Sequence, residues 1–215
     1  MAAFSAGKTY HHGDLRNALI CAAVDLATEG GPERVVLREA ARRVGVSPTA
    51  AYRHFDGRGE LLRAVRSHAR HELAASMERA AASAPGADDP VRAAESRIAA
   101  LCRGYVGFAL EQPGLYRAAF CLPRPVEADG HAPERPCAEP ELRAFTLLGE
   151  ALEALARPGV ARPGSRPVAS AAVWSAVHGL SLLLVDGPLR RLSPQGRRVA
   201  VESTLAMVVS GVHPL

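Results

Sequence analysis

Residues 37–55 read LREAARRVGVSPTAAYRHF, and this pattern predicts two short helices joined by a tight turn. The first helix is marked by an apolar stripe at i, i+3, i+4 and i+7, formed by Leu37, Ala40, Ala41 and Val44. Gly45 suits the left-handed conformation that closes a helix. Ser47 is an N-cap residue and Pro48 favours the first helical position, so a second helix begins almost at once. Two short helices around a glycine-containing turn form a helix-turn-helix.

The second of these helices offers few residues to a core. Ala51 and Phe55, four apart, are sufficient for its buried side. The remaining residues are therefore expected on exposed faces, and they are Thr49, Ala50, Tyr52, Arg53 and His54. Aromatic and basic side chains in such a place indicate a surface that contacts another molecule.

The rest of the chain also has helical periodicity. An amphipathic helix is predicted from His12 to about Gly31, and a long periodic segment from Gly59 to about Ser83. Further helical stretches, separated by proline-rich breaks, are expected at Val91–Glu111, Pro140–Ala156, Val168–Val185 and Pro194–Ser210. Ala, Leu and Arg are abundant, whereas the chain has only two Ile and five Thr. We therefore predict an all-α protein.

Charge divides the chain into two parts. Residues 1–70 hold 11 Lys and Arg against 7 Asp and Glu, whereas residues 71–215 hold 15 of each. A basic N-terminal part beside a neutral remainder favours contact of that part with a polyanion, with a chance distribution as the alternative. We predict two domains: a three-helix head at residues 1–58 that contains the helix-turn-helix, and a larger helical body at residues 59–215.

Composition excludes several classes of protein. A chain of 215 residues with 48% hydrophobic residues and a mean hydropathy of zero is expected to fold as a globular protein. No apolar run of about 18 residues and no signal peptide is apparent, so we expect the cytoplasm. The four cysteines, Cys21, Cys102, Cys121 and Cys137, form no C-x-x-C pair, which argues against a disulfide framework or a zinc site. The loop at residues 123–137 is the best candidate for disorder.

Three patterns resemble sites of other chemistries. Gly7–Thr9 looks like the end of a phosphate-binding loop, but no strand can precede it. Ser175, His178 and Asp186 lack the G-x-S-x-G turn of a hydrolase nucleophile. The His11–His12 pair would point about 100° apart on a helix and has no evident third ligand. We therefore predict neither an enzyme nor a metal site, and no cofactor.

Three segments together resemble the DNA-binding domain of the tetracycline-repressor (TetR/AcrR) family of bacterial transcriptional regulators. They are Tyr10–Arg16 (YHHGDLR), residues 37–55 and the pair Leu61–Leu62, so the resemblance covers about the first 65 residues. Trp174, His178 and Gly179 are similar to a Trp-His-Gly element in the regulatory domain of one branch of that family. The resemblance implies a helix-turn-helix head followed by a helical regulatory and dimerisation body.

The resemblance implies a set of DNA contacts on the head. Tyr52 and His54 are expected to bind phosphates, and Arg38 is expected to read a base through the two acceptors of guanine. Small residues at 49 and 50 let the helix approach base edges in the major groove. The whole implied set is Arg38, Ser47, Pro48, Thr49, Ala50, Tyr52, Arg53, His54 and Arg58, with Tyr10 and His11 from a basic arm that also holds Lys8 and His12. Arg58, between two glycines, replaces the lysine usual in the family.

Aromatic residues of the body are candidates for a ligand pocket. They are Tyr105, Phe108, Tyr116, Phe120, Trp174 and His178, and a packed core is the alternative reading of each. A small-molecule effector bound there is expected to shift the heads relative to successive DNA grooves, so ligand and DNA affinities are linked reciprocally.

The resemblance also implies a homodimer. One helix-turn-helix reads half an operator, and a palindromic operator mirrors a two-fold axis of the protein. The dimer seam is expected on the last two helices, Val168–Val185 and Pro194–Ser210, although their apolar residues are equally compatible with burial inside one subunit. The predicted function is a ligand-responsive repressor; an activator or a less specific DNA-binding protein with the same head is the alternative.

Overall fold

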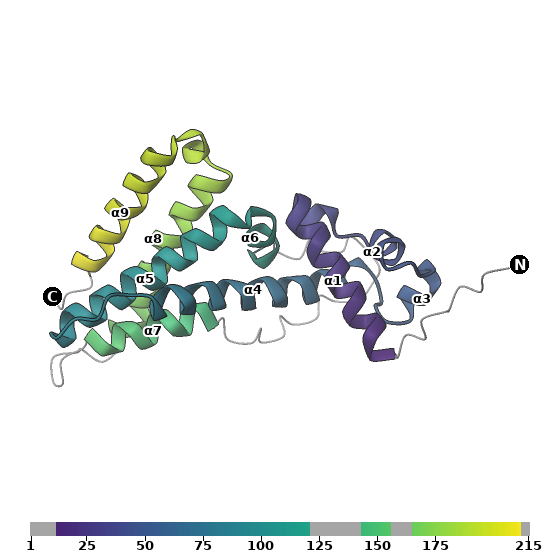
Figure 1. Cartoon of the computed structure of the whole chain (residues 1–215), viewed down its shortest axis with the longest axis horizontal. Coiled ribbons are helices and arrows are strands. Elements are labelled where there is room, and N and C mark those ends of the chain that lie inside the picture. Colours follow the sequence, from purple (N-terminus) through teal and green to yellow (C-terminus); the bar gives the residue numbers. More distant parts are fainter. Residues whose placement is uncertain (1–11, 121–142, 156–164, 212–215) are drawn as a thin grey trace, which may run out of the picture.

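The structure is a computed structural model that describes residues 12–120, 143–155 and 165–211 (Figure 1). The described residues form α-helices and two short 3-10 helices and contain no strand. The elements are α1 (His12–Gly30), η1 (Pro32–Arg34), α2 (Leu37–Val44), α3 (Pro48–Tyr52), α4 (Arg58–Ala82), α5 (Pro90–Glu111), α6 (Pro113–Phe120), α7 (Arg143–Leu155), α8 (Ser165–Val185), η2 (Pro188–Arg191) and α9 (Pro194–Gly211). The all-α prediction is confirmed.

The helix-turn-helix forms where the turn residues predict it. Gly45 closes α2 with φ 79° and ψ 28°, a left-handed conformation, and its N–H lies within reach of the carbonyls of Ala41 and Arg42. The Ser47 hydroxyl accepts a hydrogen bond from the Ala50 N–H at 3.2 Å and so caps α3. The fully buried Ala51 and the nearly buried Phe55 join α3 to the core of the head. Local backbone chemistry thus sets the angle between α2 and α3.

Helix α4 links the head to the rest of the chain. Its 25 residues span about 37 Å at 1.5 Å per residue. It packs against α1 at one end and against α5, α6 and α7 farther along, as Figure 1 shows. A Cβ on Gly104 of α5 would lie 2.7 Å from the Met77 Cα, so only glycine permits this close approach of α5 to α4. A displacement of α4 would therefore change its packing both against the head and against the rest of the bundle.

The larger part of the chain is a bundle of α4 to α9. Its most deeply buried large side chains include Tyr105, Tyr116, Ile98, Leu101 and Leu147. Helices α8 and α9 form an antiparallel pair that leans away from α4 (Figure 1). Helix α8 packs against α5 and α7, whereas α9 contacts only α5 and α8 substantially within the described residues. One side of the α8–α9 pair is therefore left without cover from the described part of this chain.

Some elements differ from the sequence-based expectation. Helix α6 was not predicted, because Gln112, Pro113 and Gly114 together resemble a break. In the structure Pro113 instead occupies the beginning of a new helix, a position that proline favours. The two 3-10 helices likewise begin at prolines, in segments expected to be breaks between helices. The arm residues Lys8, Tyr10 and His11, the loop 123–137, and Cys121 and Cys137 lie outside the described residues.

The expectation that no segment is long and apolar enough to cross a membrane was wrong. Among the described residues, the window Val168–Val185 of α8 passes that test, with a mean hydropathy of 1.8 over 18 residues. The window contains no charged residue, and its serines and glycine lower the hydropathy only slightly. A third of it is buried against the bundle, including Val173 and Val177. Length and composition of this kind also occur in the core helices of globular proteins.

Candidate nucleic-acid interface and aromatic cluster

Helix α3 presents most of its side chains outward. Thr49, Tyr52 and Arg53 are exposed, with 48% of Tyr52 accessible, and Ala50 and His54 are half-buried. The sequence-based expectation of an exposed face on α3 is therefore confirmed. An α-helix with a small residue at its beginning and basic and aromatic groups at its end matches the dimensions and charge of a DNA major groove and its phosphate edges.

Residues around α3 extend this face. Arg38, the second residue of α2, is exposed, and so are Ser47 and Pro48 in the turn before α3. Helices α2 and α3 pack on each other, so these residues belong to one rigid unit. Ser47 already uses its hydroxyl oxygen to cap α3, and its hydroxyl hydrogen stays available as a donor.

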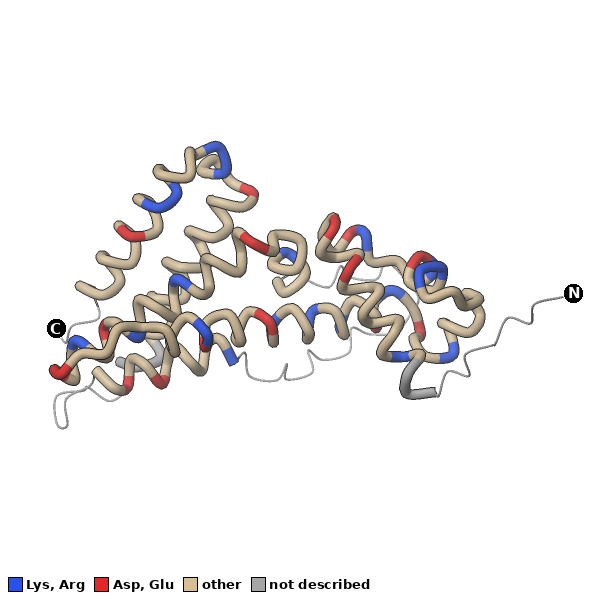
Figure 2. The backbone as a smooth tube through the Cα atoms, in the orientation of Figure 1, with Lys and Arg blue, Asp and Glu red and all other residues tan. Residues whose placement is uncertain are grey.

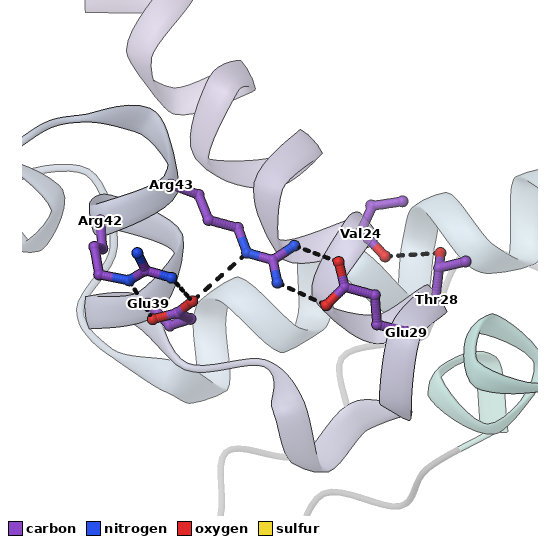
Figure 3. Close-up of polar contacts among 6 residues, drawn as sticks. All are labelled: Val24, Thr28, Glu29, Glu39, Arg42 and Arg43. Carbon is purple, nitrogen blue, oxygen red and sulfur yellow. Dashed lines mark hydrogen bonds and ion pairs between the residues drawn. The ribbon is translucent and has the colours of Figure 1, made fainter.

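Two arginines of α2 form ion pairs within the head (Figure 3). The Arg43 guanidinium binds both carboxylate oxygens of Glu29 at 2.7 and 2.6 Å, which ties the end of α1 to α2. Arg42 forms a similar two-point contact with Glu39 at 2.9 and 2.6 Å. The hydrogen bonds from Arg42 hold the pKa of Glu39 down at about 2. Figure 2 accordingly shows basic and acidic residues interspersed over the head.

Arg58 has a role that the sequence did not reveal. Its guanidinium donates to the carbonyls of Val35 at 2.9 Å and Pro32 at 2.8 Å. These bonds fasten the beginning of α4 to the link between α1 and α2. The expected phosphate contact of Arg58 is not tested by these bonds, since a guanidinium has five N–H donors and two are used here. No sequence pattern could reveal the clamp, because both acceptors are backbone atoms.

Arg16 joins α1 to the other helices of the head. Its guanidinium lies 3.0 Å from Glu60 of α4 and 4.7 Å above the centre of the Phe55 ring. Glu60 also accepts a hydrogen bond from the Asp56 N–H at 2.8 Å, and this bond contributes most to its lowered pKa. Arg16 and Glu60 are therefore positioned by each other, at the junction of the head with α4.

Five of the six candidate pocket residues form one aromatic cluster in the body. They come from α5, α6 and α8 and are Tyr105, Tyr116, Phe120, Trp174 and His178. Phe145 of α7, which sequence reasoning missed, contacts Trp174 with ring centres 5.9 Å apart. The Trp174 and His178 rings are stacked at 6.0 Å with an interplanar angle of 12°. Phe108 is buried but makes none of these ring contacts.

Two tyrosine hydroxyls meet on one histidine nitrogen at the centre of this cluster. Tyr105 Oη lies 2.7 Å and Tyr116 Oη 3.0 Å from His178 Nδ1, and Tyr116 Oη also donates to the His178 carbonyl at 3.4 Å. Burial lowers the pKa of His178, so the imidazole is neutral near pH 7. A neutral ring that accepts a hydroxyl proton at Nδ1 carries its own proton on Nε2. Burial also raises the pKa of Tyr116 to about 12, which keeps its hydroxyl a donor.

The three residues that could suggest a hydrolase triad have ordinary structural roles. The Ser175 hydroxyl donates to the Ala171 carbonyl at 2.7 Å, and the Asp186 carboxylate is held by Arg117 at 2.6 Å. His178 contacts the tyrosines instead, so the three residues do not assemble as a triad. Within the described ranges no group of three or more His, Cys, Asp and Glu residues is arranged to hold a metal ion.

The fold, with its exposed helix-turn-helix and larger helical body, defines an all-α DNA-binding transcriptional regulator. Two family models match the chain: "Bacterial regulatory proteins, tetR family" at residues 19–65, and "Tetracyclin repressor-like, C-terminal domain" at residues 98–208. The second alone covers more than half of the 215 residues. The chain belongs to the TetR family. A comparison with curated proteins gave no match.

Solved structures agree with this fold. A protein of unknown function from Rhodococcus sp. RHA1 is 26% identical, with a TM-score of 0.69 over 95% of this chain and 98% of that one. The TetR family transcriptional regulator PfmR from Thermus thermophilus is 21% identical, with a TM-score of 0.56 over 90% and 95%. A TetR variant from Acinetobacter baumannii AYE, solved in complex with minocycline, is 21% identical, with a TM-score of 0.59 over 91% and 94%. The last two likenesses show the fold alone.

Proposed function

We propose that this protein is a ligand-responsive repressor that binds a palindromic operator as a homodimer in the bacterial cytoplasm. The observation that carries the proposal is the orientation of α3. Ala51 is buried against the head, whereas Thr49, Tyr52 and Arg53 are exposed. The proposal divides the chain at residue 58, with the DNA-contacting head at 1–58 and the regulatory body at 59–215. Helix α4 begins at this boundary and transmits motion between the two.

On DNA, the head divides its contacts between reading and positioning. Thr49 and Ala50 approach base edges with Ser47 and Pro48 beside them, and Arg38 reads a guanine. Tyr52, Arg53 and His54 hold phosphates on the helix rim. Arg58 contributes to this surface chiefly by fixing the start of α4, because its guanidinium already holds two backbone carbonyls.

The uncovered side of α8 and α9 supports a homodimer. The apolar residues of these helices fall into two groups. Leu180, Leu184, Leu205 and Val208 are buried within the subunit. Leu182 and Leu183 are each 43% exposed, Val199 55% and Met207 63%. Apolar surface of this kind on two adjacent helices favours burial against a second copy, which a two-fold palindrome requires.

The aromatic cluster supports a ligand site coupled to the head. Tyr116 and Phe120 of α6 lie in the cluster, and the other end of α6 touches the head. A Cβ on Gly114 would be only 2.1 Å from the Ala27 carbonyl of α1, so the two backbones are in direct contact. Arg70 of α4 donates to the Ala119 carbonyl at 3.0 Å. A ligand that separates the cluster would therefore move α6 against both α1 and α4, and its affinity must be linked to that for DNA.

Footprinting of the fragment upstream of the gene tests the proposal. A repressor dimer should protect a discrete palindrome with half-sites one helical turn or a multiple of it apart. An effector found by ligand screening should abolish that protection. Protection that spreads without a boundary would instead favour the less specific DNA-binding protein, and a ligand that binds without altering protection would contradict the coupling.

A further inference from the structure

An open groove of about 970 Å³ lies where the head meets α4. Its walls are the N-terminal half of α1, the residues that directly follow α3 and the first half of α4. This groove is called here the α1–α4 groove. It shares only Arg53 and His54 with the proposed DNA contacts around α3, and it includes no residue of the aromatic cluster or of the α8–α9 pair. Its volume is that of sites for small molecules.

Basic side chains predominate in the α1–α4 groove. Arg16 and Glu60 neutralise each other at 3.0 Å, which leaves Asp56 as the other carboxylate of the lining. Arg53 and Arg63 line the same space, as do three histidines, His54, His68 and His71. The lining is therefore rich in N–H donors and carries a net positive charge.

Four of these donors are uncommitted in the part of the chain that the structure describes. There, the side chains of Arg53, Arg63, His68 and His71 form no hydrogen bond or ion pair, although Arg63 lies near enough to Glu60 to lower the pKa of that carboxyl. Arg63 and His71 lie two helical turns apart on α4, about 12 Å along its axis. Donors at this spacing match several anionic groups in a row rather than one small anion.

We propose that the α1–α4 groove binds phosphate groups arranged in a row. Guanidinium groups match phosphate oxygens in a two-point manner, and imidazole N–H groups add single donors. The phosphates have two possible sources, the strand of DNA that flanks the half-site and a free molecule with several phosphates, such as a nucleotide. The DNA source rests on the proposed function, whereas the free source does not. In both cases the ligand joins α1, α3 and α4 and so fixes the head relative to the body.

The test compares the full chain with the double variant Arg63→Ala, His71→Ala. Both side chains are exposed or lie on the groove surface, and neither belongs to the proposed DNA contacts of α2 and α3. Arg79→Ala is the control, since Arg79 is an exposed arginine of the same helix outside the groove. Calorimetry with sodium tripolyphosphate, without DNA, measures the free source. Anisotropy on 16-bp and 40-bp duplexes of random sequence, over a range of salt, measures the DNA source.

Saturable tripolyphosphate binding that weakens at least 10-fold in the double variant and stays unchanged in Arg79→Ala supports a free phosphorylated ligand. The DNA source is judged from the slope of log affinity against log salt concentration. A slope smaller by about 1 for the double variant, on the 40-bp duplex and not on the 16-bp one, supports the DNA strand as the source of the phosphates. The proposal is overturned if both variants behave like the original chain in both assays, or if they weaken equally. A chain that binds no DNA at low salt would refute the proposed function, and the calorimetry would still decide on the groove.

Discussion

Tyr52 and Arg38 are both exposed on the head, yet we expect them to act differently on DNA. A tyrosine hydroxyl on a phosphate contributes binding that does not depend on sequence, whereas a guanidinium on guanine contributes discrimination. Tyr52→Phe should weaken binding to operator and scrambled DNA alike, by about 10-fold. Arg38→Ala should reduce discrimination at one base position by about 1–3 kcal/mol. Competition titrations with single-base operator variants measure both effects, and an equal loss of discrimination in the two variants would refute this assignment.

His178 should make the stability of the body depend on pH. Its pKa is lowered in the folded protein by burial, so the folded state favours the neutral ring. The stabilisation is complete above the ordinary histidine pKa of about 6.5 and is lost as the pH falls through the lowered value. Between pH 7 and pH 5 the melting temperature should therefore fall.

The variant His178→Gln tests this dependence, because an amide oxygen can still accept from the tyrosine hydroxyls without titrating. Its melting temperature should change less between pH 7 and pH 5 than that of the original chain. His71→Gln, at an exposed histidine of α4, is the matched control and should keep the original dependence. If His178→Gln and the original chain lose the same number of degrees, His178 is not the responsible group.

The turn of the helix-turn-helix was predictable because the residues that form it act locally. Gly45, Ser47 and Pro48 each determine the conformation of the backbone beside them, so these three residues were sufficient to predict the turn. The pairing of Arg43 with Glu29 and of Arg58 with two carbonyls could not, since these contacts join residues 14 to 26 positions apart. Five of the six aromatic candidates lie in one cluster, and their role as a ligand pocket stays a prediction. Phe145 was missed because nothing in the sequence places α7 beside α8.

At the scale of elements, α6 is the least predictable helix and has a central position. It has eight residues and begins at a proline, so its sequence resembles a connection between helices. In three dimensions it contacts α1, α4, α5 and η1. Its place depends on the missing side chain of Gly114, which lets its backbone meet the carbonyls of Ala27 and Thr28. Tertiary packing, rather than helix propensity, determines the formation and position of α6.

Gly114→Ala should therefore destabilise the protein. The new Cβ would fall 2.1 Å from the Ala27 carbonyl oxygen and 2.7 Å from that of Thr28, and neither backbone atom can yield easily. We expect a loss of about 1–3 kcal/mol in the free energy of unfolding, after a gain of at most about 1 kcal/mol from helix propensity. Chemical denaturation measures the change.

Gly107→Ala in α5 is the matched control for that measurement. A Cβ at Gly107 has no atom within 4 Å, so the substitution should be neutral or should stabilise by up to about 1 kcal/mol. Stabilisation by both substitutions would show that α6 does not depend on close contact with α1.

At the scale of the whole molecule, helical periodicity predicted which helices exist but not which apolar residues face outward. Helices α8 and α9 carry apolar residues on more than one face, so Leu180 and Leu183 looked equivalent in sequence. Packing against α5 and α7 buries the first and leaves the second 43% exposed. The tertiary arrangement alone reveals the uncovered face.

That face should carry the dimer. Leu183→Glu places a charge in the proposed seam and should convert a dimer of about 45 kDa, twice the 22.7 kDa of one chain, into monomers at micromolar concentration. Light scattering after size-exclusion chromatography measures the mass. Arg79→Ala is a control that should stay dimeric, because Arg79 is exposed on α4, which packs against α1, α5, α6 and α7. A dimer that persists in Leu183→Glu would move the seam elsewhere.

Sequence-specific DNA binding is the central claim, and fluorescence anisotropy tests it most directly. The purified protein is titrated onto a labelled fragment from upstream of its own gene and onto scrambled DNA, at about 50 and 200 mM salt. Phosphate contacts predict a steep salt dependence on both fragments, and base reading predicts an affinity gap of at least about a thousandfold between them. Absence of binding to either fragment at 50 mM salt would contradict the account.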